Sequence, residues 1–306
     1  HDRPGVSART RALVRSAARR LGYLPDLPEA PAPVTFHLVL PSGSNAYIAE
    51  LARQAPARAP AHATIEILRA PALDPVALAR VLAGIGASDG VALVALNHPA
   101  VGEAIRALDA RGVPVVTLAS DLPDAPRLAY VGIDNGRAGR LAGYTLGRFL
   151  GREPAGPVAL VAGHLDYRGH QEREMGFRQV LAEAFPRLTL LELRESREDR
   201  AKARAETLAL LAAHPDLVGL YNAGGGTVGI GAALAAAGRR DVIFVAHEAT
   251  AENKALLLDG TLDAVIDQSG AEEIQTAFAL LARAAQGERT APLPLAPRLI
   301  LRENLP

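Results

Sequence analysis

The sequence predicts an α/β fold made of two doubly wound parallel-sheet lobes. Short runs rich in Val, Ile and Leu alternate along the chain with longer segments of helical periodicity, and this alternation is typical of parallel βαβ units. The runs are apolar throughout, which indicates sheets covered by helices on both faces. The chain has 306 residues, and its apolar runs are divided about evenly at residue 134. Two lobes therefore fit better than one oversized sheet.

Strands and helices are expected to alternate along the whole body of the chain. The predicted strands are 35–40, 64–69, 90–96, 113–118, 128–132, 157–162, 188–193, 217–221, 241–246, 262–267 and 297–301. The predicted helices lie near 45–55, 74–86, 99–111, 136–150, 168–184, 200–213, 226–237, 250–259 and 270–286.

Composition limits the classes of function. The formal net charge is +0 and the sequence pI is about 7.3, so any contact with DNA must be local. The absence of cysteine excludes disulfides, thiolate metal sites and cysteine nucleophiles, and it fits a reducing cytoplasm. The longest apolar runs, such as 91–96, are far shorter than the ~20 residues that span a bilayer. The N-terminus lacks the apolar core of a signal peptide, which a mature periplasmic protein would lack as well. We therefore expect a cytoplasmic protein without a membrane segment.

The first 33 residues differ from the rest of the chain. Residues 7–21 predict an amphipathic helix that is capped by Ser7 and carries several arginines. Its apolar positions are Val14, Ala17, Ala18 and Leu21. Repeated prolines in 24–33 deny helical and ladder hydrogen bonds and favour an extended tether.

The segment 3–25 resembles the closing part of the DNA-binding headpiece of the lactose/galactose-repressor family of transcription regulators. The matching features are the pair Val6-Ser7, the step Thr10-Arg11 and the ending Leu21-Gly22-Tyr23-x-Pro25. The resemblance implies that 1–25 is the end of a truncated helix-turn-helix headpiece and 26–33 a linker. The residues of this DNA-binding remnant would be Ser7, Arg9, Thr10, Arg11 and Tyr23. The proline-rich linker departs from the family, which has a hinge helix there.

The remaining chain resembles the type I periplasmic-binding-protein fold that these regulators carry as a sensor. Residues 130–140 and 265–268 resemble the crossovers between the lobes. Residues 172–181 resemble the helix that carries the ligand-binding arginine, and 220–227 and 242–248 resemble two further binding loops. The resemblance implies a three-strand hinge and homodimerisation. It also divides the sensor into an N-lobe, 34–134 plus 268–291, and a C-lobe, 135–267 plus 292–306.

Ligands of open α/β sheets bind beyond the carboxyl ends of the strands, and polar side chains occur at these positions in the first lobe. Asn45 can donate and accept hydrogen bonds, while Tyr47 can supply a flat wall for the C–H face of a sugar. Asn45 could equally cap the helix that follows it. Asp121 can accept hydrogen bonds from two hydroxyls, or it can form a simple turn before Pro123.

The second lobe supplies the larger set of predicted binding residues. Arg173 would present a rigid fork of donors to hydroxyls or a carboxylate, and its alternative is an ion pair with Glu172 or Glu174. The other predicted ligand-binding residues are His164, Tyr167, Asn222, Glu248 and Gln268. His164, Tyr167 and the neighbouring His170 could equally be surface residues. The family usually has aspartate where Glu248 stands, so the pocket is expected to shift by one methylene.

Motifs of metal sites and of catalysis are not met. His247-Glu248 is not followed by a histidine one helical turn later, and Gly224-Gly225-Gly226 lacks the Lys-Ser/Thr ending of a phosphate loop. No serine lies in a Gly-x-Ser-x-Gly elbow. We therefore expect no metal, no cofactor and no catalytic residue.

The leading interpretation is a ligand-responsive transcription regulator. Its partners would be a small effector (a sugar, polyol or sugar acid), operator DNA and a second copy of the chain. The alternative is a periplasmic solute-binding protein that delivers sugar to an ABC transporter and shares the fold. An enzyme comes third, since it needs a close acid/base pair facing the cleft.

Overall fold

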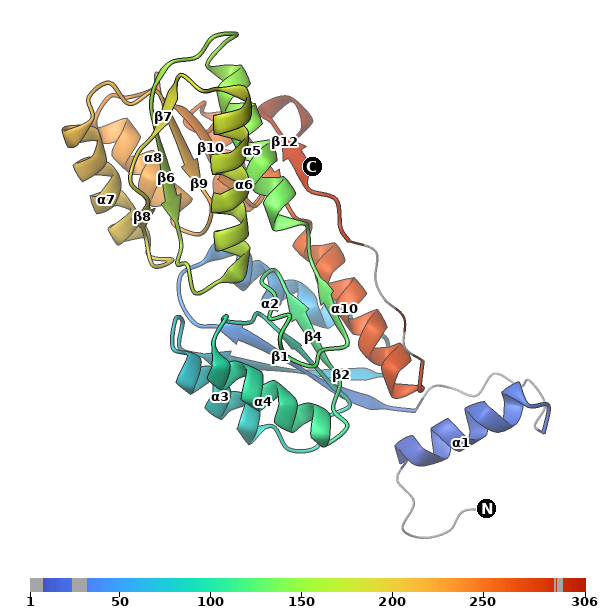
Figure 1. Cartoon of the computed structure of the whole chain (residues 1–306). Helices are drawn as coiled ribbons and strands as arrows, with labels where there is room; N and C mark the ends of the chain where they lie inside the picture. Colours follow the sequence, from blue (N-terminus) through green and yellow to red (C-terminus); the bar gives the residue numbers. More distant parts are fainter. Residues whose placement is uncertain (1–7, 24–31, 289, 291–293) are drawn as a thin grey trace.

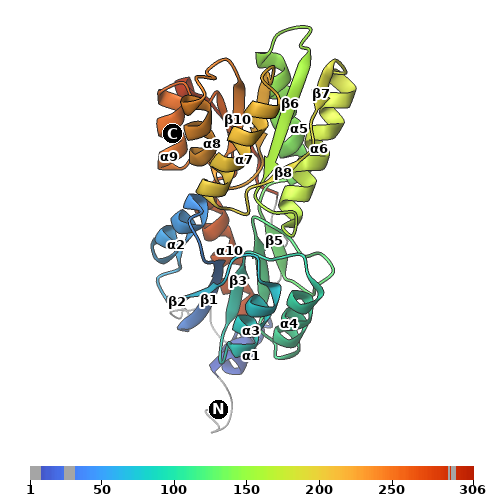
Figure 2. The same cartoon turned by 90° about the vertical axis from the view of Figure 1, so that its left-hand side faces the viewer.

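The runs rich in Val, Ile and Leu form parallel strands, and the amphipathic segments form the helices that lead from one strand to the next. The computed structural model describes residues 8–23, 32–288, 290 and 294–306. It contains two α/β lobes joined end to end (Figures 1 and 2). The two-lobed α/β fold predicted from the sequence is confirmed. The predicted linker 26–33 lies almost wholly outside the described residues.

The first lobe is built on a sheet with the strand order β2-β1-β3-β4-β5, in which every pair is parallel. Its strands are β1 (Val34–Pro41), β2 (Ala63–Ala70), β3 (Gly90–Leu93), β4 (Val115–Leu118) and β5 (Ala129–Val131). Its helices are α2 (Ala46–Arg58), α3 (Pro75–Gly84), α4 (Pro99–Ala110) and α10 (Gly270–Ala285). The last helix comes from the far end of the chain and packs on β1, β3, β4 and β5.

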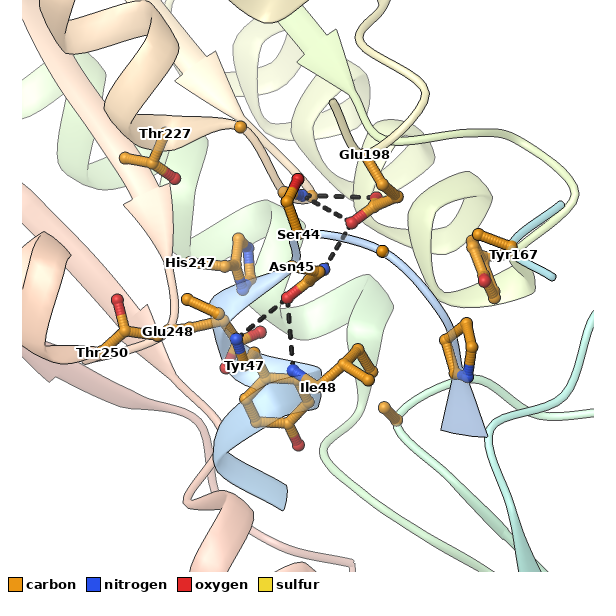
Figure 3. Close-up of a pocket in the computed structure, with 18 of the residues that line it drawn as sticks. Ser44, Asn45, Tyr47, Ile48, Tyr167, Glu198, Thr227, His247, Glu248 and Thr250 are labelled. Atoms are coloured by element: carbon orange, nitrogen blue, oxygen red, sulfur yellow. Dashed lines mark hydrogen bonds between the residues drawn. The ribbon is translucent and has the colours of Figure 1, made fainter. Parts of the chain in front are cut away.

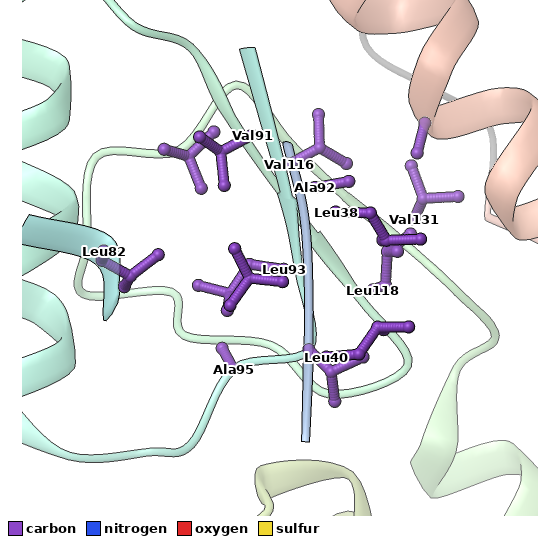
Figure 4. Packing of buried hydrophobic residues seen from close by; sticks show 14 of the residues in the cluster. Leu38, Leu40, Leu82, Val91, Ala92, Leu93, Ala95, Val116, Leu118 and Val131 are labelled. Atoms are coloured by element: carbon purple, nitrogen blue, oxygen red, sulfur yellow. The ribbon is translucent and has the colours of Figure 1, made fainter. Parts of the chain in front are cut away.

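The core of the first lobe lies between this sheet and its helices. Leu38, Leu93 and Val116 are fully buried on the central strands (Figure 4). Phe278 of α10 stacks on Phe36 of β1 with ring centroids 6.1 Å apart. Each large side chain buried in this way contributes about 1.5–3 kcal/mol, so α10 belongs firmly to the first lobe.

The second lobe has a sheet of order β12-β11-β10-β9-β6-β7, with β8 paired to β6. Its strands are β6 (Gly156–Ala162), β7 (Leu188–Leu190), β8 (Arg194–Glu195), β9 (Gly219–Asn222), β10 (Ile243–His247), β11 (Ala264–Asp267) and β12 (Arg298–Ile300). Among the described residues of this sheet, β11 and β12 are the only antiparallel pair of strands. Its helices are α5 (Asn135–Phe149), α6 (Arg168–Ala184), α7 (Arg200–Ala213), α8 (Thr227–Ala236), α9 (Ala251–Leu258) and the 3₁₀ turn η1 (Arg302–Asn304).

The prediction of one strand over 188–193 is wrong. Strand β6 pairs with β7 through Val158 and Leu190, and with β8 through Val161 and Arg194. Between these two pairs, the edge segment formed by β7 and β8 contains one more residue than β6 does, which is the arrangement of a β-bulge.

Three segments connect the lobes. The chain crosses from β5 into α5, returns from β11 into α10, and crosses again from α10 to β12, which agrees with the predicted three-strand hinge. Ile133 of the first crossover forms an isolated parallel bridge with Leu295 of the third. The exact lobe boundaries given above remain an interpretation.

The helix predicted over 7–21 is present as α1 (Ala8–Arg20). It lies apart from both sheets, beyond the carboxyl end of α10 (Figure 1). Within the described part of the chain, no helix is both long and apolar enough to cross a membrane.

Helices α5 and α6 touch backbone to backbone, because glycines line their contact. A Cβ on Gly139 would lie 2.0 Å from the carbonyl oxygen of Arg173, and a Cβ on Gly176 would lie 2.1 Å from that of Gly136. No side chain fits at either place. This contact fixes the position of α6, and with it the position of Arg173.

We predict that Gly139→Ala lowers the free energy of unfolding by about 1–3 kcal/mol, because the added methyl must push the two helices apart. The control is Gly102→Ala in α4, where the new Cβ has its nearest neighbour at 3.6 Å. That change should be neutral or stabilise by up to about 1 kcal/mol, since alanine favours a helix over glycine. Urea unfolding of both variants measures the difference, and equal stabilities would contradict the close-contact argument.

Candidate functional site

A cavity of about 210 Å³ lies between the two lobes. Its wall consists of loops that follow β1, β2, β3 and β4 in the first lobe and β6, β8, β9, β10 and β11 in the second. These are the carboxyl ends of parallel strands, where α/β sheets bind their ligands. Figure 3 shows the labelled side chains that surround it.

Asn45 links the two lobes across this cavity. Its Oδ1 accepts hydrogen bonds from the backbone N–H of Tyr47 at 2.9 Å and of Ile48 at 3.3 Å, which makes it the N-cap of α2. Its Nδ2 donates to the carboxylate of Glu198 in the other lobe (Figure 3). The capping role and the position in the cavity are therefore combined in one side chain.

Further contacts between the lobes lie beside the cavity. The N–H of Asn97 donates to the carbonyl oxygen of Asp166 at 2.8 Å, and the N–H of Gly169 donates to Oγ of Ser120 at 3.4 Å. Together with Asn45 and Glu198, these contacts hold the lobes against each other around the cavity.

Tyr47 forms an aromatic part of the wall, and residues of α10 hold its ring in place. Its hydroxyl donates to Oε2 of Glu273 in α10 at 2.6 Å. Gly270 lies against the ring, so that a Cβ there would be 2.8 Å from Cε2 of Tyr47. Burial raises the pKa of Tyr47 well above its usual value, and the nearby Glu273 adds to this.

Glu273 is a fully buried carboxyl group whose Oε1 has no hydrogen-bond partner among the described residues. Burial raises its pKa to about 8, against the opposing effects of the Tyr47 hydrogen bond and of Arg173. At neutral pH most of this group is therefore protonated.

Arg173 occupies the floor of the cavity with its side chain 4% exposed. Its Nε donates to Oδ1 of Asn135 at 2.7 Å, Nη1 to the carbonyl of Ala223 at 2.9 Å, and Nη2 to Oε1 of Gln268 at 3.2 Å. The alternative of a local ion pair is wrong: Glu172 pairs with Arg168 and Glu174 with Arg178.

Glu248 lies beside Arg173, with its Oε1 3.8 Å from Nη1 of the arginine. The same oxygen accepts a hydrogen bond from Nε2 of Gln268 at 2.8 Å. Its Oε2 is buried and has no hydrogen-bond partner among the described residues. Burial raises the pKa of Glu248 well above its usual value, and the attraction of Arg173 opposes the shift. Glu248 thus lines the cavity, with one oxygen paired to Gln268 and the other shielded from solvent.

Glu198 is a cavity residue that the sequence analysis missed. The N–H of Gly225 donates to it, with distances of 3.3 and 3.2 Å to its two oxygens. Three glycines make room for the carboxylate, since a Cβ on Gly163, Gly224 or Gly225 would come within 3 Å of it. The signal was the polar run 194–199, which directly follows a predicted strand. The glycine run 224–226 thus serves a side chain, which explains its lack of phosphate-loop residues.

Two buried histidines border the cavity. Burial lowers the pKa of His170, although Glu198, 3.8 Å from its Nε2, favours the charged form. Burial also lowers the pKa of His247, whose Nε2 meets the hydroxyl of Tyr221 at 2.7 Å. Both are therefore predominantly neutral at pH 7. The described residues contain no group of three side chains that could hold a metal ion.

The structure brings most of the predicted ligand-binding residues to the cavity. Those that line it are Asn45, Tyr47, Tyr167, Arg173, Glu248 and Gln268. Their roles in ligand binding remain predictions.

Asp121, His164 and Asn222 are not among the residues that line this cavity. Asp121 is held by Arg127, with Oδ1 2.6 Å from Nε, so the turn before Pro123 is the better interpretation. His164 accepts from the N–H of Asp166 at 3.1 Å. Asn222 is buried, and its Nδ2 donates to the carbonyl of Gly224 at 2.8 Å. Each side chain is occupied by its own neighbourhood.

The non-glycine residues with left-handed backbone are concentrated at the cavity. In the described part of the chain they are Leu73, Ala119, Arg197, Glu198, Glu248 and Ser269. All of them line the cavity or directly follow a residue that does. Such conformations cost about 1–3 kcal/mol each and cluster at functional sites.

The fold and this cavity define a class of protein: two hinged lobes with a cavity between their facing strand ends. The family model described as "Periplasmic binding protein domain" matches residues 38–289. The chain belongs to this family.

Curated relatives include ribose import binding proteins. The chain is 29% identical to the one named RbsB of Escherichia coli strain K12 over 191 residues, which are 60% of this chain and 63% of that protein. It is 28% identical to the RbsB of Salmonella typhimurium over 214 residues, or 68% of this chain and 69% of that one. The alignments thus span about two thirds of the relatives' length.

Solved structures show the same fold. A glucose-galactose binding protein, GanP, from Geobacillus stearothermophilus superposes with a TM-score of 0.81 at 24% identity, covering 90% of this chain and 99% of that one. An ABC transporter solute-binding protein from Burkholderia graminis, in complex with D-arabinose, gives 0.83 at 20% identity, covering 90% and 98%.

These relatives correct the leading interpretation of the sequence. Import binding proteins match the chain, so the predictions of a DNA-binding transcription regulator of the lactose/galactose-repressor family and of a cytoplasmic location are wrong. The resemblance at 3–25 rested on a few short motifs around one arginine-rich helix, while the two-lobed fold is common to both classes. Operator DNA is therefore no longer an expected partner, and homodimerisation remains a prediction.

The prediction of DNA-binding residues is therefore withdrawn as well. Ser7 and the side chain of Arg9 lie outside the described residues. Thr10 and Arg11 lie on α1, and Tyr23 is exposed just after it.

We predict that Glu273 makes the protein less stable as the pH rises. A carboxyl group whose pKa is raised by folding stabilises the folded state fully below its unfolded pKa of about 4.3. This contribution is lost as the pH rises through the folded value, about 8. Between pH 4.5 and 8, the unfolding free energy of the wild type should therefore fall relative to that of Glu273→Gln. Parallel pH profiles of the two proteins in urea unfolding would contradict the assignment.

We predict that Asn45→Ala costs about 0.5–2 kcal/mol of stability through loss of the helix cap. Asn45→Ser keeps a capping oxygen but is too short to bridge to Glu198, so it should recover most of this loss. Chemical unfolding of the two variants separates the cap from the link between lobes. If serine restored none of the stability, the link would outweigh the cap.

Proposed function

We propose that this chain is the sugar-capturing component of an ABC-type importer and works outside the cytoplasmic membrane. The observation that carries the proposal is the cavity of about 210 Å³ between the lobes, to which both lobes contribute polar side chains and tyrosines at the carboxyl ends of their strands. The similarity to ribose import binding proteins supports the same assignment.

The cavity offers what a monosaccharide needs. Hydroxyl groups both donate and accept hydrogen bonds, and the wall offers the carboxyl groups of Glu198 and Glu248 and the amide of Asn45. Tyr47 and Tyr167 supply aromatic surface for the C–H faces of a sugar ring. A volume of about 210 Å³ is below the roughly 300–1,000 Å³ of pockets for larger ligands, which favours a single sugar ring.

Binding without catalysis is the expected role. Each nitrogen of Arg173 already donates to a protein oxygen, so this residue organises the floor. The curated relatives are themselves named as binding proteins.

A thermal-shift screen of the purified chain against pentoses and hexoses tests the proposal. A ligand that binds only the folded state adds about 2.7 kcal/mol of stability at a hundred times its Kd, so at least one neutral sugar should raise Tm. No shift with any of these sugars at millimolar concentration would overturn the proposal.

We predict that Arg173→Ala abolishes the shift and also lowers Tm in the absence of sugar, because buried oxygens of Asn135, Ala223 and Gln268 lose their donor. The control is Arg178→Ala on the same helix, where the arginine pairs at the surface with Glu174. The control should keep both Tm and the sugar response. A full sugar response in folded Arg173→Ala would remove this residue from the site.

A further inference from the structure

The hydroxyl group of Tyr47 points away from the cavity that its ring helps to line (Figure 3). It donates to Oε2 of Glu273 at 2.6 Å. Glu273 belongs to α10, is fully buried, and is not among the described residues that line the cavity. The ring of Tyr47 is therefore available to a ligand, while its hydroxyl is engaged with the protein.

The start of α10 leaves just enough room for this ring. A Cβ on Gly270 would lie 2.8 Å from Cε2 of Tyr47 and 2.9 Å from Cδ2 of Leu51, and carbon atoms do not approach so closely without repulsion. Tyr47 is 7% exposed. The ring is thus held by a hydrogen bond at its hydroxyl and by packing along its edge.

The segment that begins α10 also carries part of the cavity floor. Gln268 accepts from Nη2 of Arg173 at 3.2 Å and donates to Oε1 of Glu248 at 2.8 Å. Arg173 and Glu248 belong to the second lobe, whereas Tyr47 belongs to the first. Residues 268–273 therefore hold cavity residues of both lobes in place.

A neutral carboxyl group is sufficient for the contact with Tyr47. Burial raises the pKa of Glu273 to about 8, so most of the group is protonated at neutral pH. Its oxygen still accepts the hydrogen bond from the phenol. Glu273→Gln has the same shape, no charge and an amide oxygen that can take over this role. Glu273→Leu removes the acceptor and keeps a side chain of similar size.

We propose that Glu273 is a positioning residue of the sugar site: it does not touch the ligand, but it fixes the Tyr47 ring in the orientation that receives the C–H face of a sugar. This inference rests on the sugar-binding function proposed above. A ring that the protein already holds does not have to be ordered by the ligand, so less binding energy is lost on immobilising it. Without the acceptor at Glu273 the ring gains freedom, and the affinity for the sugar falls.

Isothermal titration calorimetry at pH 7 with D-ribose, D-arabinose, D-glucose and D-galactose tests the inference. Each of these sugars that binds the wild type should bind Glu273→Leu about fivefold more weakly, which corresponds to the cost of ordering one side chain. Glu273→Gln should stay within about twofold of the wild type, because its amide oxygen accepts from the Tyr47 hydroxyl.

Tyr47→Phe removes the other half of the contact. It should weaken binding to about the same extent as Glu273→Leu. The double variant should bind no more weakly than either single variant, because both changes break the same hydrogen bond. Two independent effects would instead multiply to about 25-fold.

The control is Ser88→Ala, which removes a partner of another buried side chain in the first lobe. Oγ of Ser88 meets Nδ1 of His37 at 2.9 Å, and neither is among the residues that line the cavity. This variant should lose stability but keep the affinity of the wild type for each sugar. The comparison separates a general weakening of the lobe from a displacement of the Tyr47 ring.

Three results would overturn the inference and leave the proposed function standing: unchanged affinity in Glu273→Leu, no rescue by glutamine, or losses that multiply in the double variant. If Glu273→Leu fails to fold, Tyr47→Phe decides, and full affinity in that variant would overturn the inference as well. If none of the four sugars binds the wild type, the inference is also overturned, and the wider thermal-shift screen then decides the proposed function.

Discussion

One buried guanidinium connects the parts of this molecule that have to act together. Arg173 donates to Asn135 on the first crossover, to Ala223 in a loop of the second lobe, and to Gln268 on the second crossover. A buried charge is tolerated only when polar partners compensate its lost hydration, and these three hydrogen bonds are joined by the carboxyl group of Glu248, 3.8 Å away. The hinge segments and the cavity floor are thus one network, positioned by the close backbone contact of α5 and α6.

Backbone strain and glycine placement both point to the same cavity. Glu248 and Glu198 have φ values of 70° and 61°, and neither is a glycine. Gly163, Gly224 and Gly225 surround the Glu198 carboxylate so closely that a side chain at any of them would collide with it. Conformations of this kind lower stability, and the described ones are concentrated where the lobes meet.

Periodicity was sufficient to predict the fold, because apolar runs and amphipathic segments report directly on burial. The helices at 168–184 and 200–213 have the predicted bounds. Asn45 and Glu248 could be placed at the cavity because each ends or follows a strand. The same rule failed for Asp121 and Asn222, since the direction of a side chain depends on partners such as Arg127 and Gly224, which position after a strand does not reveal. Glu198 was missed because it lies within a polar run after the predicted strand 188–193, and position in such a run does not reveal which side chain turns toward the cavity.

Function was harder to predict than fold, because the decisive difference between regulators and import proteins is not in the lobes. A transcription regulator and a solute-binding protein close the same two lobes on the same kind of ligand. Only α1 distinguished the two interpretations, and an arginine-rich amphipathic helix is a weak signal by itself. The similarity to import proteins over 191 residues of the lobes outweighs it.

The contacts around the cavity also explain how a ligand could control the lobes. Asn45 with Glu198, Asn97 with Asp166, and Gly169 with Ser120 join the lobes through hydrogen bonds. Opening of the lobes would break these contacts. Each such bond contributes only about 0.5–1.5 kcal/mol net, because water replaces the lost partner. Opening is therefore inexpensive in the empty protein. A ligand that contacts residues of both lobes, such as Asn45 and Glu248, adds contacts that exist together only when the lobes are closed, and this differential affinity would shift the population toward the closed form.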